Sequence, residues 1–307
     1  MSAIPQNLTA FETPPAEADY ARESRVASLV SYLKRNRSLI VGVCFLLALL
    51  LFVVIGHLTV DTQDARPMSA RSLQKPSSEL PFGSDKQGRN LYAVMVAGTP
   101  LTFGLGLVAG AIGVLVGSII AFIAAYYGGV VDDVLRVIID VGLTVPSLLI
   151  LVIVSMNADG GLTVREMTFV IAIVAWLYPA RTIRAQVLTL KERGYVQVAR
   201  LSGMKGPEII FRELVPNLLP YLVGTLVNTV SAAVLAAIGL EMLGLGPFEA
   251  PTLGMTLYWV NYNAAIINGW WWWWVPPIVV ISMLFTGLFL IAVGLDEVAN
   301  PRLRSRV

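Results

Sequence analysis

The sequence is poor in charge and in the side chains that most often bind metals or form cross-links. Only 14% of its 307 residues are charged, and it contains one cysteine, Cys44, and one histidine, His57. A single cysteine cannot form an internal disulfide, and inside an apolar run Cys44 is expected to pack as a small hydrophobic residue. His57 has no cysteine or histidine at ligand spacing, so we expect no metal site.

The same scarcity argues against several classes of function. The net charge of +2 is too small to favour nucleic acid as a partner. One histidine, one cysteine in an apolar run and no His-Glu-x-x-His motif make a membrane-embedded enzyme a weak hypothesis, and we assign no catalytic residue. No G-x-x-x-x-G-K-[ST] occurs, so the chain has no P-loop with which to bind ATP. We therefore expect no cofactor in this chain.

Apolar residues dominate instead. They make up 56% of the sequence, with a mean hydropathy of +0.72, which is more than a water-exposed surface tolerates. Six apolar segments are each long enough to cross a hydrocarbon core of about 30 Å. We expect an all-α integral membrane protein with transmembrane helices at residues 39–60, 100–126, 134–156, 167–187, 218–245 and 275–295.

The distribution of Lys and Arg predicts how these spans are oriented. Six spans place both termini on one side, and 16 of the 22 Lys and Arg residues lie in the termini, loops and adjoining span ends of that side. By the positive-inside rule this side is cytosolic. Residues 20–38 read as a basic amphipathic segment that lies along the inner membrane surface. The expected divisions are a cytosolic tail (1–38), a first transmembrane helix (39–60), an external loop with a surface helix (61–97), a five-helix core (98–297) and a cytosolic tail (298–307).

Four glycines in the second predicted span recur at spacings of 4, 3 and 4. This spacing puts all of them on one face of a helix, where small residues let another backbone approach closely. We therefore assign a role in helix packing to Gly106, Gly110, Gly113 and Gly117.

The loop between the fourth and fifth spans contains two short helix signals. Residues 194–203 read as a helix that ends at Gly203, and Pro207 followed by Glu208 suits the first turn of another. Pro216 is expected to end this second turn and to open the fifth span. We call residues 194–214 the elbow. It is too short to be a domain and too apolar to be a solvated loop, so it needs a partner surface.

The elbow resembles the signature loop of the permease subunits of ATP-binding-cassette importers. That loop reads Glu-Ala-Ala, three residues, Gly, nine residues, Ile-x-Leu-Pro; this chain has Gln197-Val198-Ala199, then Gly203, then Glu213-Leu214-Val215-Pro216. The resemblance implies that residues 191–215 form a coupling helix that sits in a groove of an ATPase subunit. It implies that this contact is made by Tyr195, Gln197, Ala199, Arg200, Gly203, Met204 and Lys205.

A wider resemblance, over residues 35–304, is to the C-type permeases of oligopeptide and dipeptide importers. It rests on segments at residues 82–90, 146–149, 178–184 and 300–302. It implies a fold of the type I importer class, in the plasma membrane of a bacterium or archaeon. It also implies four kinds of neighbour besides the lipid bilayer: a homologous second permease, two ATPase subunits, the ATP and Mg²⁺ that they bind, and an extracytoplasmic substrate-binding protein.

Residues 82–90 carry two local predictions. Ser84 and Gln87 have the spacing of a capping box, which predicts that a helix starts there. Asp85 and Arg89 are four residues apart and are expected to pair. Both features favour a structural role at the outer membrane surface.

Glu241 and five consecutive tryptophans, residues 270–274, are the candidates for substrate contact. A carboxylate inside a membrane span tends to face a cavity. Tryptophan at this depth is normally a residue of the interfacial belt, and the alternative is that Trp270 or Trp273 stacks on a ligand. These residues depart from the peptide-transporting relatives and resemble the branch that carries short oligosaccharides, so both substrate classes stay open.

An ion-coupled secondary carrier is the alternative function. Such a carrier is expected to have two halves with matching broken helices around a site at the membrane midplane. The sequence shows no such repeat, and a carrier of this kind would leave the elbow without a role.

Overall fold

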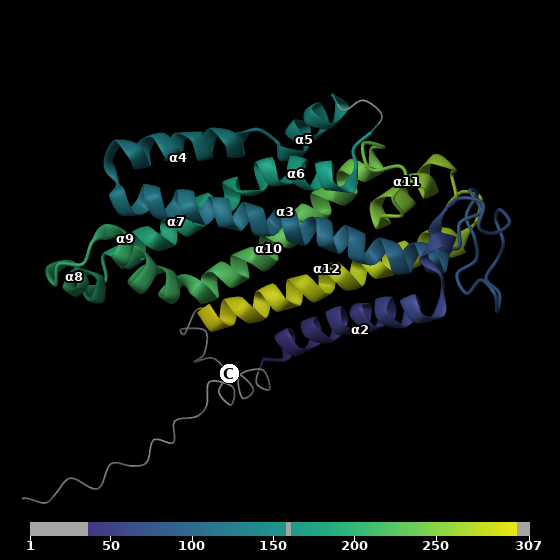
Figure 1. The fold of residues 1–307 in the computed structure, drawn as a ribbon, viewed down its shortest axis with the longest axis horizontal. Coiled ribbons are helices and arrows are strands. Elements are labelled where there is room, and N and C mark those ends of the chain that lie inside the picture. Colours follow the sequence, from purple (N-terminus) through teal and green to yellow (C-terminus); the bar gives the residue numbers. More distant parts are fainter. Residues whose placement is uncertain (1–35, 158–160, 300–307) are drawn as a thin grey trace, which may run out of the picture.

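The computed structural model describes residues 36–157 and 161–299, and in that part of the chain the regular structure is helical, with no strand. The predicted segment at residues 20–35 and the tail beyond residue 299 lie outside the described residues. The long helices run along one common direction (Figure 1). They are α2 (Arg37–Thr59), η1 (Thr62–Ala65), α3 (Leu91–Tyr127), α4 (Gly129–Thr144), α5 (Ser147–Met156), α6 (Val164–Ala175), α7 (Leu177–Lys191), α8 (Gly194–Leu201), α9 (Gly206–Ile209), η2 (Ile210–Leu214), α10 (Val215–Met242), α11 (Leu253–Tyr262) and α12 (Trp271–Ala299).

Five helical stretches among the described residues are long and apolar enough to cross a membrane, and a bent pair makes up to six. The five are residues 37–59, 91–127, 164–191, 206–242 and 271–295. The bent pair is α4 and α5, which meet at an angle of 78°. The six predicted spans are therefore all represented by helices, and the all-α membrane fold is confirmed.

The third predicted span, residues 134–156, is not one straight helix in the structure. Pro146 lies at the break between α4 and α5, and Val145 before it has extended backbone angles, φ −81° and ψ 126°. Proline has no backbone N–H and disfavours the helical conformation in the residue that precedes it. The chain consequently turns at this point, and α4 and α5 point in different directions.

The second span starts earlier than predicted, at Leu91. The side chain of Asn90 caps this helix by accepting hydrogen bonds from the backbone N–H groups of Tyr92 and Ala93. The capping box predicted for Ser84 and Gln87 is wrong, because no helix begins there. The Ser84 hydroxyl instead holds an irregular loop together, donating to the Arg71 carbonyl and accepting from the Gln74 N–H.

The predicted pair of Asp85 and Arg89 is present in this loop. The Arg89 Nε donates to the Asp85 carboxylate, and both side chains are almost fully buried. Trp272 adds a bond from a distant part of the chain, because its indole N–H donates to the Ser84 carbonyl at 3.2 Å. These contacts fix the loop of residues 61–90 onto the start of α12, at the end of the bundle opposite α8 and α9 (Figure 1).

The fifth span is continuous with the elbow. Pro216 does not end a separate helix, because α9, η2 and α10 follow one another without a break from Gly206 to Met242. Residues 210–214 form a π-turn in which the Val215 N–H bonds to the Ile210 carbonyl. Pro216 lies in the first turn of α10, directly after this π-turn.

Helix α3 lies at the centre of the bundle, and its glycines are close to the neighbouring backbones. A Cβ atom added at Gly110 would be 2.9 Å from the Cα of Val230 in α10, and one added at Gly106 would overlap Val234. On the same helix, added Cβ atoms would be 2.8 Å from the carbonyl of Ala175 for Gly113 and from that of Trp176 for Gly117. The four glycines thus permit close packing of α3 against α10 and against the α6–α7 junction.

Helix α2 lies on one side of the bundle and α4 on the opposite side (Figure 1). Helix α2 packs along α12 through Gly42, which comes close to the Gly287 carbonyl. The other face of α2 exposes large apolar side chains such as Leu50 and Leu51. No Asp, Glu, Lys or Arg occurs between Ser38 and Thr59, so this face suits contact with lipid tails.

Candidate functional site

The elbow lies at one end of the bundle, where α8 and α9 form a helical hairpin (Figure 1). Gly203 joins the two helices with φ +82°, a left-handed conformation that favours glycine. The Gly203 N–H donates to the Arg200 carbonyl, and the Met204 N–H donates to the Ala199 carbonyl. This pair of bonds is a Schellman motif, which satisfies the last carbonyl groups of α8 and reverses the chain.

The inner face of the elbow is packed onto α3 and α7. Val196 and Ile209 are fully buried, and Ala199 is nearly so. They belong to one apolar cluster with Ala121, Phe122, Ala125, Ile183 and Val187. The Lys191 ammonium adds a polar link, donating to the Ala125 carbonyl at 2.8 Å. The elbow therefore shares one apolar core with two membrane-spanning helices.

The outer face of the elbow exposes large apolar side chains. Leu201 is 88% exposed, Phe211 73% and Val198 63%. Arg200 and Lys205 are also exposed, so the elbow exposes charged as well as apolar groups. Exposed apolar side chains that cluster within a polar surround mark a site of interaction with another protein.

Tyr195 lies at the edge of this outer face and is about one-third exposed. Burial, followed by the negative charge of Glu213, raises the pKa of the Tyr195 hydroxyl above its ordinary value. The hydroxyl is therefore neutral at physiological pH, so it is a hydrogen-bond donor and acceptor rather than a charge.

The residues predicted at the coupling contact are divided between the two faces. Tyr195, Arg200, Gly203 and Lys205 are exposed, and Gln197 is partly exposed. Ala199 and Met204 turn inward toward the apolar cluster. The contact set named from the sequence did not include the most exposed apolar side chains, Leu201, Phe211 and Val198. The signal for Val198 and Leu201 was that they are three residues apart, a spacing that makes them neighbours on one helix face.

Glu241 is fully buried at the end of α10, with both carboxylate oxygens out of contact with solvent. Gly246 and Gly254 pack directly against it, so that a Cβ atom at either position would overlap the side chain. The carboxylate faces the N-terminus of α11, near the Thr252 hydroxyl and the N–H groups of Gly254 and Met255, although no oxygen meets strict hydrogen-bond geometry. Glu241 therefore lies between the end of α10 and the start of α11, packed against Gly246 and Gly254, and this placement suits helix packing.

The tryptophan run is also mostly internal. Trp273 is fully buried and Trp272 almost so, in a cluster with Leu91, Val260 and Ala265. The rings of Trp270 and Trp273 stack with their centroids 6.1 Å apart. Trp271 is the member that is most exposed, at 55%. The structure therefore places the run at the end of the bundle opposite the elbow, joining α12 to α11 and to the loop of residues 61–90.

No group of three or more His, Cys, Asp or Glu side chains that could hold a metal ion occurs in the part of the chain that the structure describes. Several charged side chains in that part form ion pairs. Arg184 of α7 binds the Asp132 carboxylate of α4 with two nitrogen atoms, and Arg212 binds Glu208 at 2.7 Å within the elbow. The first of these pairs joins α4 to α7.

Comparisons with known proteins agree with this architecture. The family model of the "binding-protein-dependent transport system inner membrane component" matches residues 113–305. The dipeptide transport system permease protein of Alkalihalophilus pseudofirmus is 29% identical over 294 residues, which cover 95% of each chain. The oligopeptide transport system permease protein of Bacillus subtilis is 27% identical over 313 residues, covering 99% of this chain and 100% of that protein.

The matched family region begins in the middle of α3 and includes α4 to α12, and therefore the elbow. The relatives extend the similarity to the N-terminal part of the chain, including α2 and the loop of residues 61–90. None of these matches supports the ion-coupled carrier considered from the sequence. The chain belongs to the family of inner membrane components of binding-protein-dependent transport systems, and it is a permease subunit of such an importer.

Proposed function

We propose that this permease couples to ATPase subunits through the outer face of the elbow and carries short peptides across the membrane. The observation that carries the coupling proposal is the division of the elbow into two faces. Its inner face shares a core with α3 and α7, while its outer face exposes Leu201 and Phe211. An apolar surface of this kind, held on a rigid base, suits insertion into a groove of another protein.

The elbow is then the point at which movement of the ATPases reaches the membrane helices. ATP and Mg²⁺ bind to the partner subunits, and this chain catalyses no covalent step. When the ATPases close, each draws its elbow inward, and α3 and α7 follow because Val196 and Ile209 are buried against them. Closely packed helices move as units rather than deforming continuously, so the displacement changes which end of the pathway is open.

The proposed complex contains a second permease homologous to this one, two ATPase subunits and an external substrate-binding protein. The elbow and the ends of α3 and α7 face the cytosol, as the distribution of Lys and Arg favours. The loop of residues 61–90 and α11 then face outward, where the binding protein releases its substrate. This orientation also places both termini in the cytosol.

Peptides are the proposed substrate class. The relatives reported above are named for dipeptide and oligopeptide transport. The residues that suggested an oligosaccharide are in positions that packing explains, because Glu241 and Trp273 are fully buried. Binding measurements on the partner binding protein, comparing short peptides with short oligosaccharides, test this choice. Binding of oligosaccharides alone would contradict it.

Replacement of Leu201 tests the coupling proposal. Leu201→Glu places a charge on the outer face without touching the buried core, since Leu201 is 88% exposed. Met68→Glu is the matched control, because Met68 is 89% exposed and lies at the other end of the bundle. We expect the ATPase subunits to copurify with the control variant and to be lost from Leu201→Glu. Equal recovery of the ATPases with both variants would rule out this face as their binding surface.

A further inference from the structure

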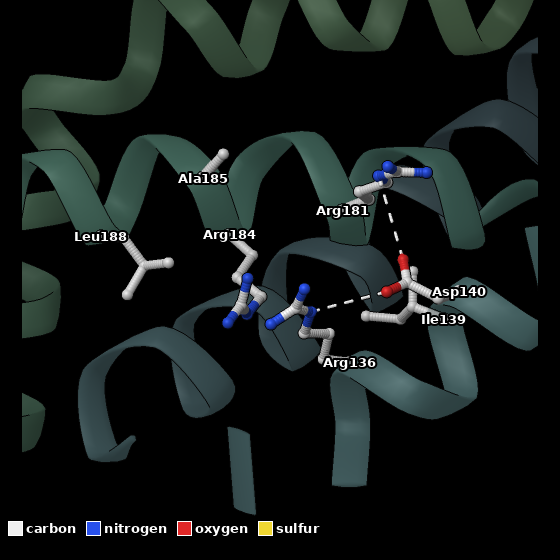
Figure 2. Close-up of a pocket in the computed structure, with 7 residues that line it drawn as sticks. All are labelled: Arg136, Ile139, Asp140, Arg181, Arg184, Ala185 and Leu188. Carbon is white, nitrogen blue, oxygen red and sulfur yellow. Dashed lines mark ion pairs between the residues drawn. The ribbon is translucent and has the colours of Figure 1, made fainter. Parts of the chain in front are cut away.

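A pocket with a charged lining lies between α4 and α7 (Figure 2). It has a volume of about 410 Å³, and its charged lining consists of Arg136, Asp140, Arg181 and Arg184. This volume is within the range of small-molecule sites, which is about 300–1,000 Å³. The guanidinium groups of Arg136 and Arg181 approach the Asp140 carboxylate from two helices, as Figure 2 shows.

The pocket has more positive than negative charge. The Asp140 carboxylate is 3.6 Å from the Arg136 Nε and 4.0 Å from the Arg181 Nε, so these two cations share one anion at long distances. Arg184 is already bound by Asp132 through two hydrogen bonds. The adjacent Asp133 and Lys191 add one charge of each sign, and the excess of one positive charge remains. Because the side chains of Arg136 and Arg181 are both 63% exposed, their free N–H groups are available to an anion.

The distance of the pocket from the elbow end of the bundle limits what its charged side chains can contact. Arg136 lies seven residues into α4, and Arg181 lies ten residues before the end of α7. At 1.5 Å per residue they are about 10 and 15 Å from the elbow end of these helices. Exposed charges at this depth in a membrane protein face water or another protein rather than lipid tails. The side of the bundle formed by α4 and α7 therefore suits contact with water or another protein, whereas α2, without charges between Ser38 and Thr59, suits contact with lipid.

We propose that the pocket of Arg136, Asp140 and Arg181 lines the transport pathway near its inner end and binds the carboxylate of the passing substrate. This inference rests on the proposed transport of peptides. Guanidinium groups bind carboxylates with paired hydrogen bonds, and the shared Asp140 is placed to receive a substrate ammonium group. The partial pairing with Asp140 keeps the attraction weak, and weak binding is what a transported molecule needs in order to leave.

The reporter for this pocket is Ala185→Cys. Ala185 lines the pocket, is exposed and carries no charge. The natural Cys44, exposed on α2, is an internal control on the opposite side of the bundle. The complete complex is placed in phosphatidylcholine liposomes and treated with two water-soluble methanethiosulfonates, one with a sulfonate and one with a trimethylammonium group. A lipid-soluble maleimide detects thiols that face the bilayer.

The proposal predicts a specific pattern of labelling. The thiol at position 185 reacts about fivefold faster with the anionic reagent than with the cationic one, because nearby unpaired positive charge concentrates anions. Arg136→Gln together with Arg181→Gln changes the local charge from an excess of one positive to an excess of one negative and is expected to reverse this preference, whereas the corresponding pair of Lys substitutions keeps it. Dialanine slows the reaction, but dialanine amide does not. Cys44 reacts with the maleimide alone. Leu188→Cys, on the same wall of the pocket, is the second reporter if Ala185→Cys assembles poorly.

Three results would overturn the proposal. A thiol at 185 and at 188 that reacts only with the maleimide would place the pocket against lipid. Equal rates for the two charged reagents would show that the pocket does not attract anions. Slower labelling only after phosphatidylglycerol is added would assign the site to a lipid headgroup. A separate experiment tests the proposed transport of peptides itself. If the unmodified complex, supplied with its binding protein, shows no ATP-dependent uptake of dialanine, that function fails whatever the labelling shows.

Discussion

The Met204 N–H donates a hydrogen bond of 3.2 Å to the Ala199 carbonyl, across the left-handed residue Gly203. This bond closes the end of α8 and sets the angle at which α9 leaves it. Both residues also turn toward the apolar cluster on α3 and α7. The turn therefore fixes the outer face of the elbow relative to the membrane helices, and several outcomes can be predicted from it and from the packing around it.

Gly203→Val is expected to uncouple the importer. No atom lies within 4 Å of an added Cβ at Gly203, so the effect comes from the backbone, where a β-branched residue at positive φ costs about 1–3 kcal/mol. We expect peptide uptake to fall several-fold while ATP hydrolysis by the complex persists. Gly194→Ala is the control, because Gly194 also faces open space but has no left-handed φ. Parallel loss of uptake in both variants would contradict this role for the turn.

Gly110→Ala is expected to destabilise the bundle. The added methyl group would lie 2.8 Å from the Val230 side chain and 2.9 Å from its backbone, so α3 and α10 must move apart, at a cost of about 1–3 kcal/mol. Gly104→Ala, on the same helix but with no atom within 4 Å of the added Cβ, is expected to be neutral or slightly stabilising. Thermal unfolding of the two purified variants measures the difference. Equal midpoints would show that the α3–α10 contact is looser than described.

Trp273 is expected to act through packing. Trp273→Ala removes a fully buried side chain and should cost about 3–5 kcal/mol of stability, whereas Trp273→Phe keeps most of the volume and should cost less. We expect uptake per folded complex to be unchanged in Trp273→Phe. Trp271→Ala, at a 55% exposed position, is the control for loss of an indole. A fall in uptake by folded Trp273→Phe would instead assign this ring to the substrate pathway.

The sequence was sufficient to locate the six apolar spans, the elbow and the pairing of Asp85 with Arg89, because each depends on local spacing and composition. The bend at Pro146 and the early start of α3 after its cap Asn90 each depend on a single residue inside or next to an apolar run, so composition and periodicity do not reveal them. The predicted capping box at Ser84 was wrong because the Ser84 hydroxyl bonds to the backbone of Arg71 and Gln74, in another part of the loop. Long-range partners of this kind leave no periodic signal.

Which side chains of the elbow are exposed was harder to predict than where the elbow lies in the sequence. The sequence placed the elbow between the fourth and fifth spans, but which side chains face outward depends on how α8 docks on α3 and α7. Leu201 and Ala199 are two residues apart, yet one is 88% exposed and the other 7%. The pocket of Arg136 and Arg181 is assembled from two helices, and their contact could not be derived from either segment alone.

Photo-crosslinking from position 201 tests the coupling account most directly. p-Benzoylphenylalanine in place of Leu201 puts a reactive group at the most exposed apolar position of the elbow, and the same group in place of Met68 is the control. The account predicts that irradiation of the assembled importer joins position 201 to an ATPase subunit and that position 68 forms no such product. An assembled, transport-competent complex in which position 201 gives no ATPase adduct would contradict it.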